Sequence, residues 1–307
     1  QGALRTCVAG GRSHARGGDK IAFIFSGNGA QWPGMGRQML AECPTFRKAV
    51  AEVDACFRPL AGWSVLEAME WPVAVWNLTA TEFAQPMLFT VQAGIIAVLR
   101  EQGIAPDMVL GHSVGEVSAG YACGALSLRQ AVRVLHARSI AQARTRGAGR
   151  MAAANISLEQ ATTLIAEMGL TLEVAGVNSP GSITLAGKVD QLKAIGKRVV
   201  GELHSPFKML DLDYAFHSKS MNSVRGQLIE SLEDLAPQHG NVRFISTGTG
   251  REIDGRKLTA KYWWRNVRQT VQLSPALESI MNEGVSVFLE ISPNPIMQSY
   301  VRQTLQH

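Results

Sequence analysis

Short apolar runs alternate with helical patterns over the first half of the chain. Ile21–Phe25 is an apolar run that stops at a glycine cluster, and Met108–Leu110 is a second run that also stops at a glycine. Runs this short, bounded by turn residues, are typical of buried strands. Helical patterns follow the first run through about Arg58, occupy Pro86–Glu101 and resume near Gly115. This alternation predicts a parallel sheet covered by helices on both faces.

The middle of the chain has a different order of elements. We expect a strand, a helix, two strands joined by a turn, a second helix and a last strand, over residues 151–156, 157–169, 172–177, 183–186, 190–200 and 207–212. Ser157 and Gln160 have the spacing of a capping box at the start of the first helix. The order β-α-β-β-α-β is that of a ferredoxin-like fold.

These patterns predict an α/β protein with two parts. The larger part, residues 21–147 and 213–307, is expected to resemble an α/β-hydrolase, with a parallel sheet and a nucleophile elbow. A ferredoxin-like subdomain, residues 148–212, is inserted into it. Residues 1–20 are rich in glycine and arginine and lack the apolar core of a signal peptide, so we expect a flexible linker of a domain cut from a longer chain.

Composition narrows the class of protein. Hydrophobic residues make up 46% of the 307 residues and charged residues 18%, which excludes a disordered chain or a coiled coil. There is no uninterrupted apolar run of about 18 residues, so no membrane span is expected. The four cysteines lack the C-x-x-C spacing of zinc sites and fit a reducing, cytoplasmic compartment. The net charge of +5 comes from dispersed Lys and Arg, which disfavours nucleic acid and suits an acidic protein or a CoA-type ligand.

The five residues Gly111–Gly115 have the pattern G-x-S-x-G between an expected strand and an expected helix. In that context the pattern indicates a nucleophile elbow, with Ser113 exposed on a sharp turn. The N–H groups at the start of the helix, including that of Val114, would face an oxyanion formed there. The alternative is a glycine-rich turn in which Ser113 only caps the helix.

A nucleophilic serine needs a base, and histidine is the usual one. His217 follows the last strand of the expected subdomain, where the chain returns to the larger part, and such junctions border clefts. His112 lies inside the elbow and favours a structural role. The others fall in chain ends, on a polar helix face or in polar loops: His14, His136, His204, His239 and His307. From the residues alone, His217 stays a candidate base or an ordinary loop histidine.

Arg138 is the most informative charge. A Ser-x-x-Gln pattern predicts a helix over about residues 128–144, and Arg138 falls in the middle of its apolar stripe. A buried guanidinium needs an anion, because an unpaired buried charge costs several kcal/mol. That anion is either an internal carboxylate or the carboxylate of a substrate. The loop Ser26–Gly36 lacks the third glycine of a dinucleotide motif and fits better as a backbone-NH loop over the nucleophile.

Several motifs together resemble one family. They are IAFIFSGNGAQWPGMG (21–36), AQP (84–86), GHSVGE (111–116), an arginine twenty-five residues after the serine, NSPGSITLAG (178–187), YAFHS (214–218) and LEISPNPIM (289–297). Their order and spacing resemble the malonyl-CoA:acyl-carrier-protein transacylase family, and within it the acyltransferase domains of polyketide and fatty acid synthases. The resemblance covers about residues 20–305.

The resemblance implies roles for individual residues. Ser113 matches the acylated nucleophile, His217 the base and Arg138 the arginine that binds the free carboxylate of a malonyl-type unit. Main-chain N–H groups at Asn28 and Val114 match the oxyanion hole, although Asn28 departs from the usual glutamine. Further matches are Gln85 in the pocket, Gln269, whose main-chain carbonyl would orient the base, and Tyr214, Phe216 and His112 beside the substrate.

The family resemblance also implies the reaction. A malonyl-type unit passes from CoA to Ser113 and then to the phosphopantetheine thiol of an acyl carrier protein, with ping-pong kinetics and no bound cofactor or metal. The residues YAFH (214–217) mix the family's malonyl and methylmalonyl patterns, and the bulk of Phe216 favours malonyl. Expected partners are an acyl carrier protein and neighbouring synthase domains (ketosynthase and linker), and the isolated domain is expected to be a monomer. Alternatives are an α/β serine hydrolase that acts on thioesters and a non-catalytic scaffold domain.

Overall fold

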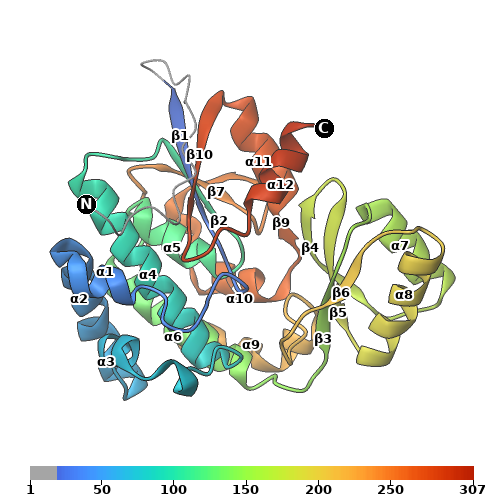
Figure 1. Ribbon diagram of the computed structural model, residues 1–307, viewed down its shortest axis with the longest axis horizontal. Coiled ribbons are helices and arrows are strands. Elements are labelled where there is room, and N and C mark those ends of the chain that lie inside the picture. The colour runs from blue at the N-terminus through green and yellow to red at the C-terminus, as the bar shows by residue number, and fades with distance from the viewer. Residues whose placement is uncertain (1–18) are drawn as a thin grey trace.

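The computed structural model describes residues 19–307, which form two five-stranded sheets with helices packed around them (Figure 1). The predicted linker, residues 1–20, lies outside the described residues except for its last two, and Lys20 already belongs to the first strand. The expected α/β fold class is confirmed.

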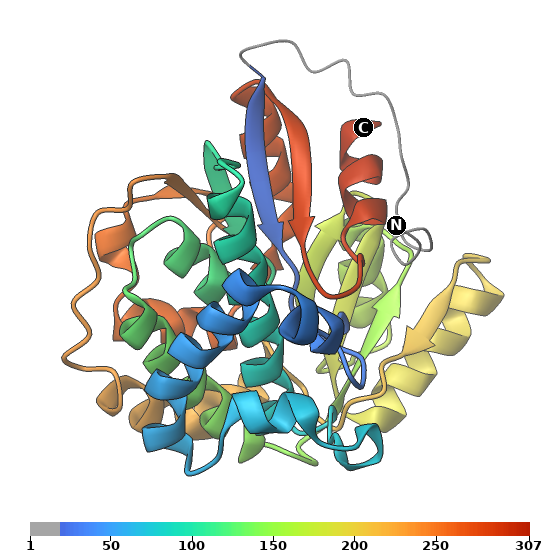
Figure 2. The ribbon, with the colours of Figure 1, turned by 60° about the vertical axis from the view of Figure 1, so that its left-hand side comes forward.

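The first sheet has the strand order β10-β1-β2-β7-β8. Its strands are β1 (Lys20–Phe25), β2 (Met108–Gly111), β7 (Arg243–Ser246), β8 (Arg251–Ile253) and β10 (Val285–Ile291). All neighbours pair in parallel except β7 and β8. Figure 2 shows β1 and β10, from opposite ends of the chain, side by side.

The side chains of β1 alternate between two apolar cores. Phe23 and Phe25 belong to the core formed with α2, α4, α5 and α6, whereas Ala22 and Ile24 pack against α11 and α12 on the opposite face. A strand whose residues are buried on both faces must be apolar throughout, and this is why the sequence shows a continuous apolar run instead of an alternating one.

The helices are bounded as follows: α1 (Arg37–Glu42), α2 (Pro44–Ala61), α3 (Val65–Glu70), α4 (Thr81–Glu101), α5 (Gly115–Ala122), α6 (Leu128–Ala143), α7 (Leu158–Glu167), α8 (Val189–Gly201), α9 (Arg225–Glu230), α10 (Ala260–Arg268), α11 (Leu273–Asn282) and α12 (Gln298–Leu305). Short 3-10 helices occupy η1 (Val73–Val75), η2 (Lys219–Val224) and η3 (Gly255–Lys257). The expected start of α4 at Pro86 is wrong. Pro86 lies inside the helix, where it is buried, and the packing of α4 outweighs the hydrogen bond that proline cannot donate.

By length and composition alone, the helix α4 could cross a membrane. However, 67% of its most apolar stretch is buried inside the protein, as expected for a core helix that packs against α2 and α6.

The second sheet has the order β6-β3-β5-β4-β9. Its strands are β3 (Arg150–Ala154), β4 (Glu173–Ser179), β5 (Ser182–Gly187), β6 (Phe207–Met209) and β9 (Val271–Gln272). The predicted order β-α-β-β-α-β is observed over residues 150–209, and both hydrogen bonds of the capping box at Ser157 are present. The last predicted strand is shorter than expected, since it ends at Met209.

One face of the second sheet carries α7 and α8, and the other faces the first sheet (Figure 1). Ala152 and Ala154 pack under the helices, whereas Met151 and Ala153 line a cavity between the sheets. The alternation of side chains along a strand therefore makes β3 a wall of that cavity. The fifth strand, β9, comes from the C-terminal part of the chain and pairs in parallel with β4.

Candidate active site

Ser113 lies at the turn between β2 and α5, at the carboxyl edge of the first sheet. Its φ of 55° is in the left-handed region, as the sharp turn of a nucleophile elbow requires. The turn also depends on close approach of backbone. A Cβ at Gly111 would lie 2.1 Å from the carbonyl carbon of Gly115, and one at Gly115 would lie 2.3 Å from the carbonyl oxygen of Phe25. Glycine is therefore required at both positions.

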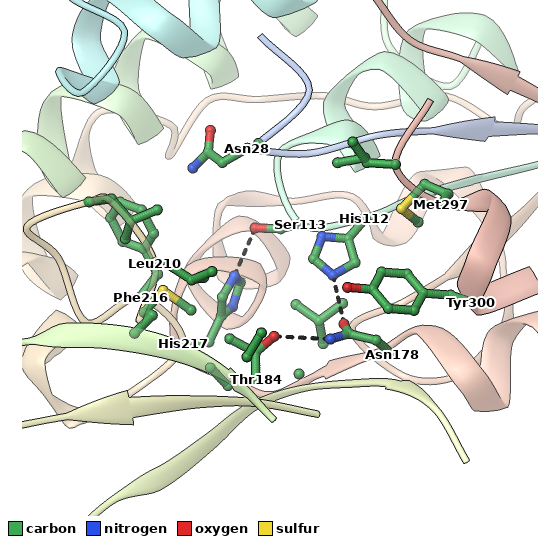
Figure 3. Close-up of a pocket in the computed structure, with 18 of the residues that line it drawn as sticks. Asn28, His112, Ser113, Asn178, Thr184, Leu210, Phe216, His217, Met297 and Tyr300 are labelled. Atoms are coloured by element: carbon green, nitrogen blue, oxygen red, sulfur yellow. Dashed lines mark hydrogen bonds between the residues drawn. The ribbon is translucent and has the colours of Figure 1, made fainter. Parts of the chain in front are cut away.

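His217 lies against Ser113 at the edge of the cavity (Figure 3). The Nε2 atom of His217 is 2.7 Å from Ser113 Oγ, and its Nδ1 atom is 2.9 Å from the main-chain oxygen of Gln269. A carbonyl oxygen only accepts, so Nδ1 carries the proton and Nε2 accepts from the serine hydroxyl. This is the tautomer that a general base for Ser113 requires.

The imidazole of His217 is buried, and its environment keeps it neutral. Burial is the larger cause that lowers its pKa, to about 3, and the positive charge of Arg138 is the second cause. The ring is therefore an unprotonated acceptor at physiological pH. A negative charge placed beside Arg138 would offset part of this shift and make His217 a stronger base.

Arg138 is fully buried, as the position of this residue in the apolar stripe predicts. Its Nη2 donates to Ser113 Oγ at 2.8 Å, and its Nη1 donates to Gln85 Oε1 at 2.8 Å. Over residues 20–307, no carboxylate forms an ion pair with Arg138, so an internal carboxylate is not its direct partner. The guanidinium of Arg138 is thus a buried positive charge next to Ser113 without a carboxylate from the described residues bound to it.

Two amide side chains that the sequence analysis did not single out complete the setting of Arg138. Gln142 Oε1 accepts from Nη1 at 2.9 Å, and Asn266 Oδ1 accepts from Nε at 2.9 Å. Four of the five guanidinium N–H groups thus have acceptors, and one N–H on Nη2 remains for a ligand beside Ser113. Gln142 lies one helical turn after Arg138, so the helical spacing alone would have placed it beside the guanidinium. Asn266 is distant in sequence, and no sequence pattern places it near Arg138.

Glu116 is the acidic residue whose charge acts on Arg138, and it does so without a direct contact. Asn266 Nδ2 donates to Glu116 Oε2 at 2.8 Å and to the main-chain oxygen of Ser113 at 3.0 Å. Tyr262 and Thr247 also donate to the Glu116 carboxyl group. Burial raises the pKa of Glu116, and these donors offset the shift in part. The amide of Asn266 therefore separates the two buried charges and keeps the guanidinium free of a direct carboxylate contact.

The cavity beside Ser113 has a volume of about 400 Å³. Its walls come from the second sheet and from the segments that follow strands of the first sheet, and they include Asn28, Ser113, His217, Met151, Thr184 and Met297. This volume lies within the range of small-molecule sites.

Two predicted oxyanion donors border the nucleophile. Asn28 lines the cavity (Figure 3), and Val114 follows Ser113 directly before α5. Within the described part of the chain, the main-chain N–H groups of Asn28 and Val114 make no hydrogen bond with protein atoms. Both N–H groups are consequently available to an oxygen atom bound above Ser113.

The two aromatic residues before His217 have different positions relative to the cavity. Phe216 lines the cavity, and Tyr214 stacks on it with ring centroids 4.8 Å apart. The Tyr214 hydroxyl accepts from Arg146 Nε at 3.0 Å, away from Ser113. Tyr214 therefore supports Phe216 from behind, and its own predicted contact with a substrate stays a prediction.

His112 lines the cavity next to Ser113, as Figure 3 shows. Its Nε2 donates to Asn178 Oδ1 at 3.2 Å, and Asn178 Nδ2 donates to Thr184 Oγ1 at 2.9 Å. Burial lowers the pKa of His112, with a further contribution from the charge of Arg138, so His112 is neutral. Among residues 19–307, no cluster of His, Cys, Asp or Glu is placed to hold a metal ion.

This arrangement suits acyl transfer through a serine ester. A hydroxyl is held between a neutral imidazole and a buried guanidinium, with free N–H groups above it and a narrow cavity beside it. The guanidinium favours an acyl group that carries a negative charge.

Comparisons with known proteins agree with this chemistry. A sequence model of the acyl transferase domain matches residues 22–307. The chain is 35% identical over 297 residues to the mycoketide-CoA synthase of Mycobacterium tuberculosis, covering 95% of this chain and 7% of the synthase. The chain thus spans less than a tenth of that curated relative.

Solved structures are similar over most of the chain. The acyltransferase domain from module 8 of the salinomycin polyketide synthase aligns with a TM-score of 0.89 and 30% identity, covering 94% of this chain and 68% of the solved one. The malonyl-CoA:ACP transacylase of Synechocystis sp. PCC 6803 aligns with a TM-score of 0.81 and 25% identity, covering 94% of each chain.

Proposed function

Since the chain belongs to the acyl transferase domain family and is an acyltransferase of the polyketide synthase type, we propose that it loads a malonyl unit from CoA onto an acyl carrier protein. The observation that carries the proposal is the contact of Arg138 Nη2 with Ser113 Oγ at 2.8 Å, made by a buried guanidinium that has no carboxylate partner over residues 20–307. A malonyl ester on Ser113 has its carboxylate one methylene away from the ester carbonyl, within reach of that nitrogen.

In the first half-reaction, His217 Nε2 accepts the proton of Ser113 as Oγ attacks the thioester carbon of malonyl-CoA. The developing oxyanion accepts hydrogen bonds from the main-chain N–H groups of Asn28 and Val114. The carbon–sulfur bond then breaks, and the departing CoA thiolate takes the proton from His217. The Gln269 carbonyl stabilises the protonated imidazole while it carries that proton.

The second half-reaction reverses these proton transfers on a different thiol. The malonyl ester waits with its carboxylate paired to Arg138. The phosphopantetheine thiol of the carrier loses its proton to His217 and attacks the ester carbon, and Ser113 Oγ regains the proton as it leaves. A covalent intermediate between two substrates gives ping-pong kinetics.

Phe216 supports a preference for malonyl over methylmalonyl. Its ring lines the cavity and is stacked against Tyr214, so it cannot retreat without breaking that contact. We expect a branch methyl on the α-carbon to meet this ring. One methyl group changes binding in a pocket by about 1–3 kcal/mol, so the preference is expected to be moderate.

Replacing Phe216 with Ser should raise the ratio of methylmalonyl to malonyl loading by about 10-fold, because the smaller side chain leaves room for the branch. Competition between the two CoA thioesters, read as the mass of the acylated enzyme, measures the ratio. Tyr214→Phe keeps the stacked ring and serves as the control. An unchanged ratio in Phe216→Ser would show that the selectivity is set elsewhere.

The partners and the compartment are proposed from the similar proteins and not from the geometry of the site. Similar proteins are parts of multidomain synthases, so we propose an acyl carrier protein and neighbouring ketosynthase and linker segments as partners, in the cytoplasm. The excess of five positive charges suits an acidic carrier. The proposed chemistry uses CoA and phosphopantetheine as substrates and needs no resident cofactor.

Incubation with malonyl-CoA in the absence of a carrier tests the proposal. We expect the intact mass to increase by one malonyl group on Ser113 and the added mass to persist until a carrier protein is supplied. Ser113→Ala should show no increase. Rapid release of free malonate would instead favour a thioester hydrolase, and no adduct at all would favour a scaffold.

A further inference from the structure

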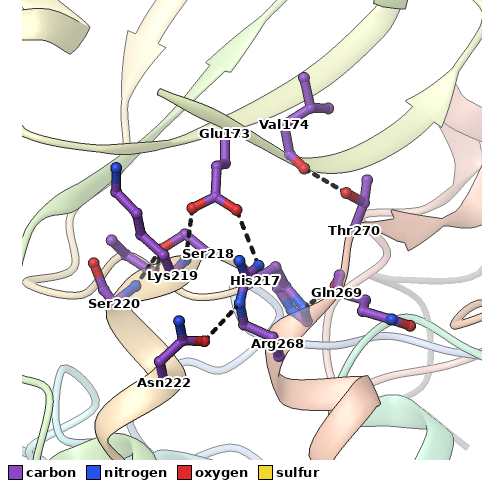
Figure 4. A network of polar contacts seen from close by, with 11 residues as sticks. Glu173, Val174, His217, Ser218, Lys219, Ser220, Asn222, Arg268, Gln269 and Thr270 are labelled. Atoms are coloured by element: carbon purple, nitrogen blue, oxygen red, sulfur yellow. Dashed lines mark hydrogen bonds and ion pairs between the residues drawn. The ribbon is translucent and has the colours of Figure 1, made fainter. Parts of the chain in front are cut away.

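One acidic side chain of the second sheet contacts both segments that position His217. Glu173, the first residue of β4, lies between the segment that follows His217 and the segment that precedes Gln269 (Figure 4). Its side chain is 29% exposed, so it is partly shielded from water.

The first contact fixes the segment of the base. Glu173 Oε1 accepts a hydrogen bond from the main-chain N–H of Lys219 at 2.6 Å. Lys219 begins η2, two residues after His217. A charged acceptor strengthens such a bond beyond a neutral one. The carboxylate therefore holds the chain immediately after the catalytic base.

The second contact fixes the segment of the orienting carbonyl. Glu173 Oε2 forms an ion pair with Arg268 Nη1 at 2.9 Å. Arg268 Nε also donates to Asn222 Oδ1 at 2.9 Å, so the guanidinium is held from two sides. Arg268 directly precedes Gln269, whose main-chain oxygen accepts from His217 Nδ1. One carboxylate thus ties together the base and the carbonyl that sets its tautomer.

The backbone conformation of His217 depends on the contacts around it, which include those of Glu173. His217 has a φ of 57°, a conformation that persists only where the surroundings hold it. Its own N–H donates to the Val267 oxygen at 3.2 Å, near the long end of the hydrogen-bond range. The stronger, charge-assisted contacts lie one step away, at Lys219 and Arg268.

We propose that Glu173 is a positioning residue of the Ser113–His217 dyad, an inference that rests on the proposed function of that dyad. It acts through Lys219 and Arg268 and does not touch the substrate. Loss of its charge allows His217 to leave the geometry in which Nδ1 meets the Gln269 oxygen and Nε2 meets Ser113.

A purely structural role for Glu173 would be to hold β4 against the segment 268–272. Other contacts already do so, since Thr270 Oγ1 donates to the Val174 oxygen at 2.7 Å and β9 pairs in parallel with β4. We therefore expect β4 and this segment to stay joined when Glu173 is replaced, and the effect of a substitution to fall on the dyad.

The test uses Glu173→Gln, Glu173→Ala and a matched control in the complete chain. Glu173→Gln keeps an acceptor for Lys219 but loses the ion pair. The control, Glu202→Gln, removes the ion pair of Glu202 with Arg198 on α8, where the two side chains lie 2.6 Å apart. The rate of Ser113 modification by a fluorophosphonate reports the nucleophile without requiring malonyl recognition, and ¹⁵N signals of the His217 ring report its tautomer.

We expect the maximal rate of modification to fall about 10-fold in Glu173→Ala, with the apparent affinity for the probe unchanged. Glu173→Gln should fall less, Glu202→Gln should match the wild type, and the Nδ1–H signal should weaken in the order of the rates. In malonyl loading, kcat should fall while KM stays the same.

A wild-type rate and an unchanged ¹⁵N signal in folded Glu173→Ala would overturn the inference, as would a lowered melting temperature with no change in rate. If Glu173→Ala does not fold, Glu173→Gln decides in the same terms. A wild-type enzyme that reacts with the fluorophosphonate but not with malonyl-CoA would contradict the proposed function and leave this test valid.

Discussion

Replacing His217 with Ala should lower the rate of Ser113 acylation by malonyl-CoA about 10³-fold. A positioned general base contributes about 10²- to 10⁴-fold, and the hydroxyl of Ser113 has no other base within hydrogen-bond distance among the described residues. The contact from Arg138 is a donor and cannot accept the proton. Rapid-mixing experiments with intact-mass detection measure the first turnover and separate acylation from transfer.

The pH dependence of the acylation rate is a second test of the role of His217. Because burial and Arg138 lower the pKa of His217 to about 3, the acylation rate should stay level from neutral pH downward and fall only as the pH approaches that value. Stability behaves differently. The unfolded chain takes up a proton on this imidazole below about pH 6.5, before the folded protein does, so the folded state loses stability between about pH 6.5 and 3.

The control for His217 is His239, whose side chain is 74% exposed and lies on a surface loop. His239→Ala should acylate as the wild type does. If His217→Ala retained the wild-type rate and pH profile, another group would be the base and the dyad would be wrong.

Replacing Arg138 with Ala should change which acyl groups are accepted. Malonyl loading should fall by about 10²- to 10³-fold, since the substrate carboxylate would be buried without a partner. Acetyl loading, which brings no carboxylate, should hold or rise. Parallel measurements of kcat/KM with malonyl-CoA and acetyl-CoA give the ratio directly.

The same substitution should raise the pKa of His217, because it removes the second cause of the downward shift. It also leaves Gln85 Oε1 and Asn266 Oδ1 without their donor in a buried site, whereas Gln142 Oε1 keeps the bond from Gln85 Nε2, so thermal unfolding must be followed beside activity. Arg133→Ala, on the exposed side of the same helix, is the matched control. A parallel loss of malonyl and acetyl loading in folded protein would show that Arg138 serves the serine and not the carboxylate.

The elbow was predictable from the sequence because its determinants are local. Five consecutive residues contain the nucleophile and both glycines that the turn requires, and the flanking apolar run and helix supply the context. Burial of Arg138 was equally predictable, since helical periodicity alone places it among Val134 and Leu135.

The partners of these residues were harder to predict from the sequence, because they come together only in the folded protein. His217 meets Ser113 across a large separation in sequence, and residue types alone left it one candidate among seven histidines. Asn266, which decides that Arg138 has no direct internal carboxylate, lies on α10, beyond the elements that the patterns predicted. The family resemblance supplied His217, but it did not supply Asn266 or Gln142.

The predicted boundaries of helices and strands were wrong where tertiary contacts override local preference. The start of α4 was expected at Pro86, yet burial extends the helix five residues earlier, to Thr81. The strand β9 has only two residues and no periodicity from which to detect it. Its existence depends on the free edge of β4, which no local pattern reveals.

That two-residue strand has a practical consequence for engineering substrate choice. A graft that exchanges residues 150–209 between two synthases would transplant four strands and leave behind the fifth, so the donor's β4 would meet a foreign backbone along its outer edge. A chimera whose junctions also carry residues 267–272 keeps that seam intact, and with it the carbonyl that orients the imidazole.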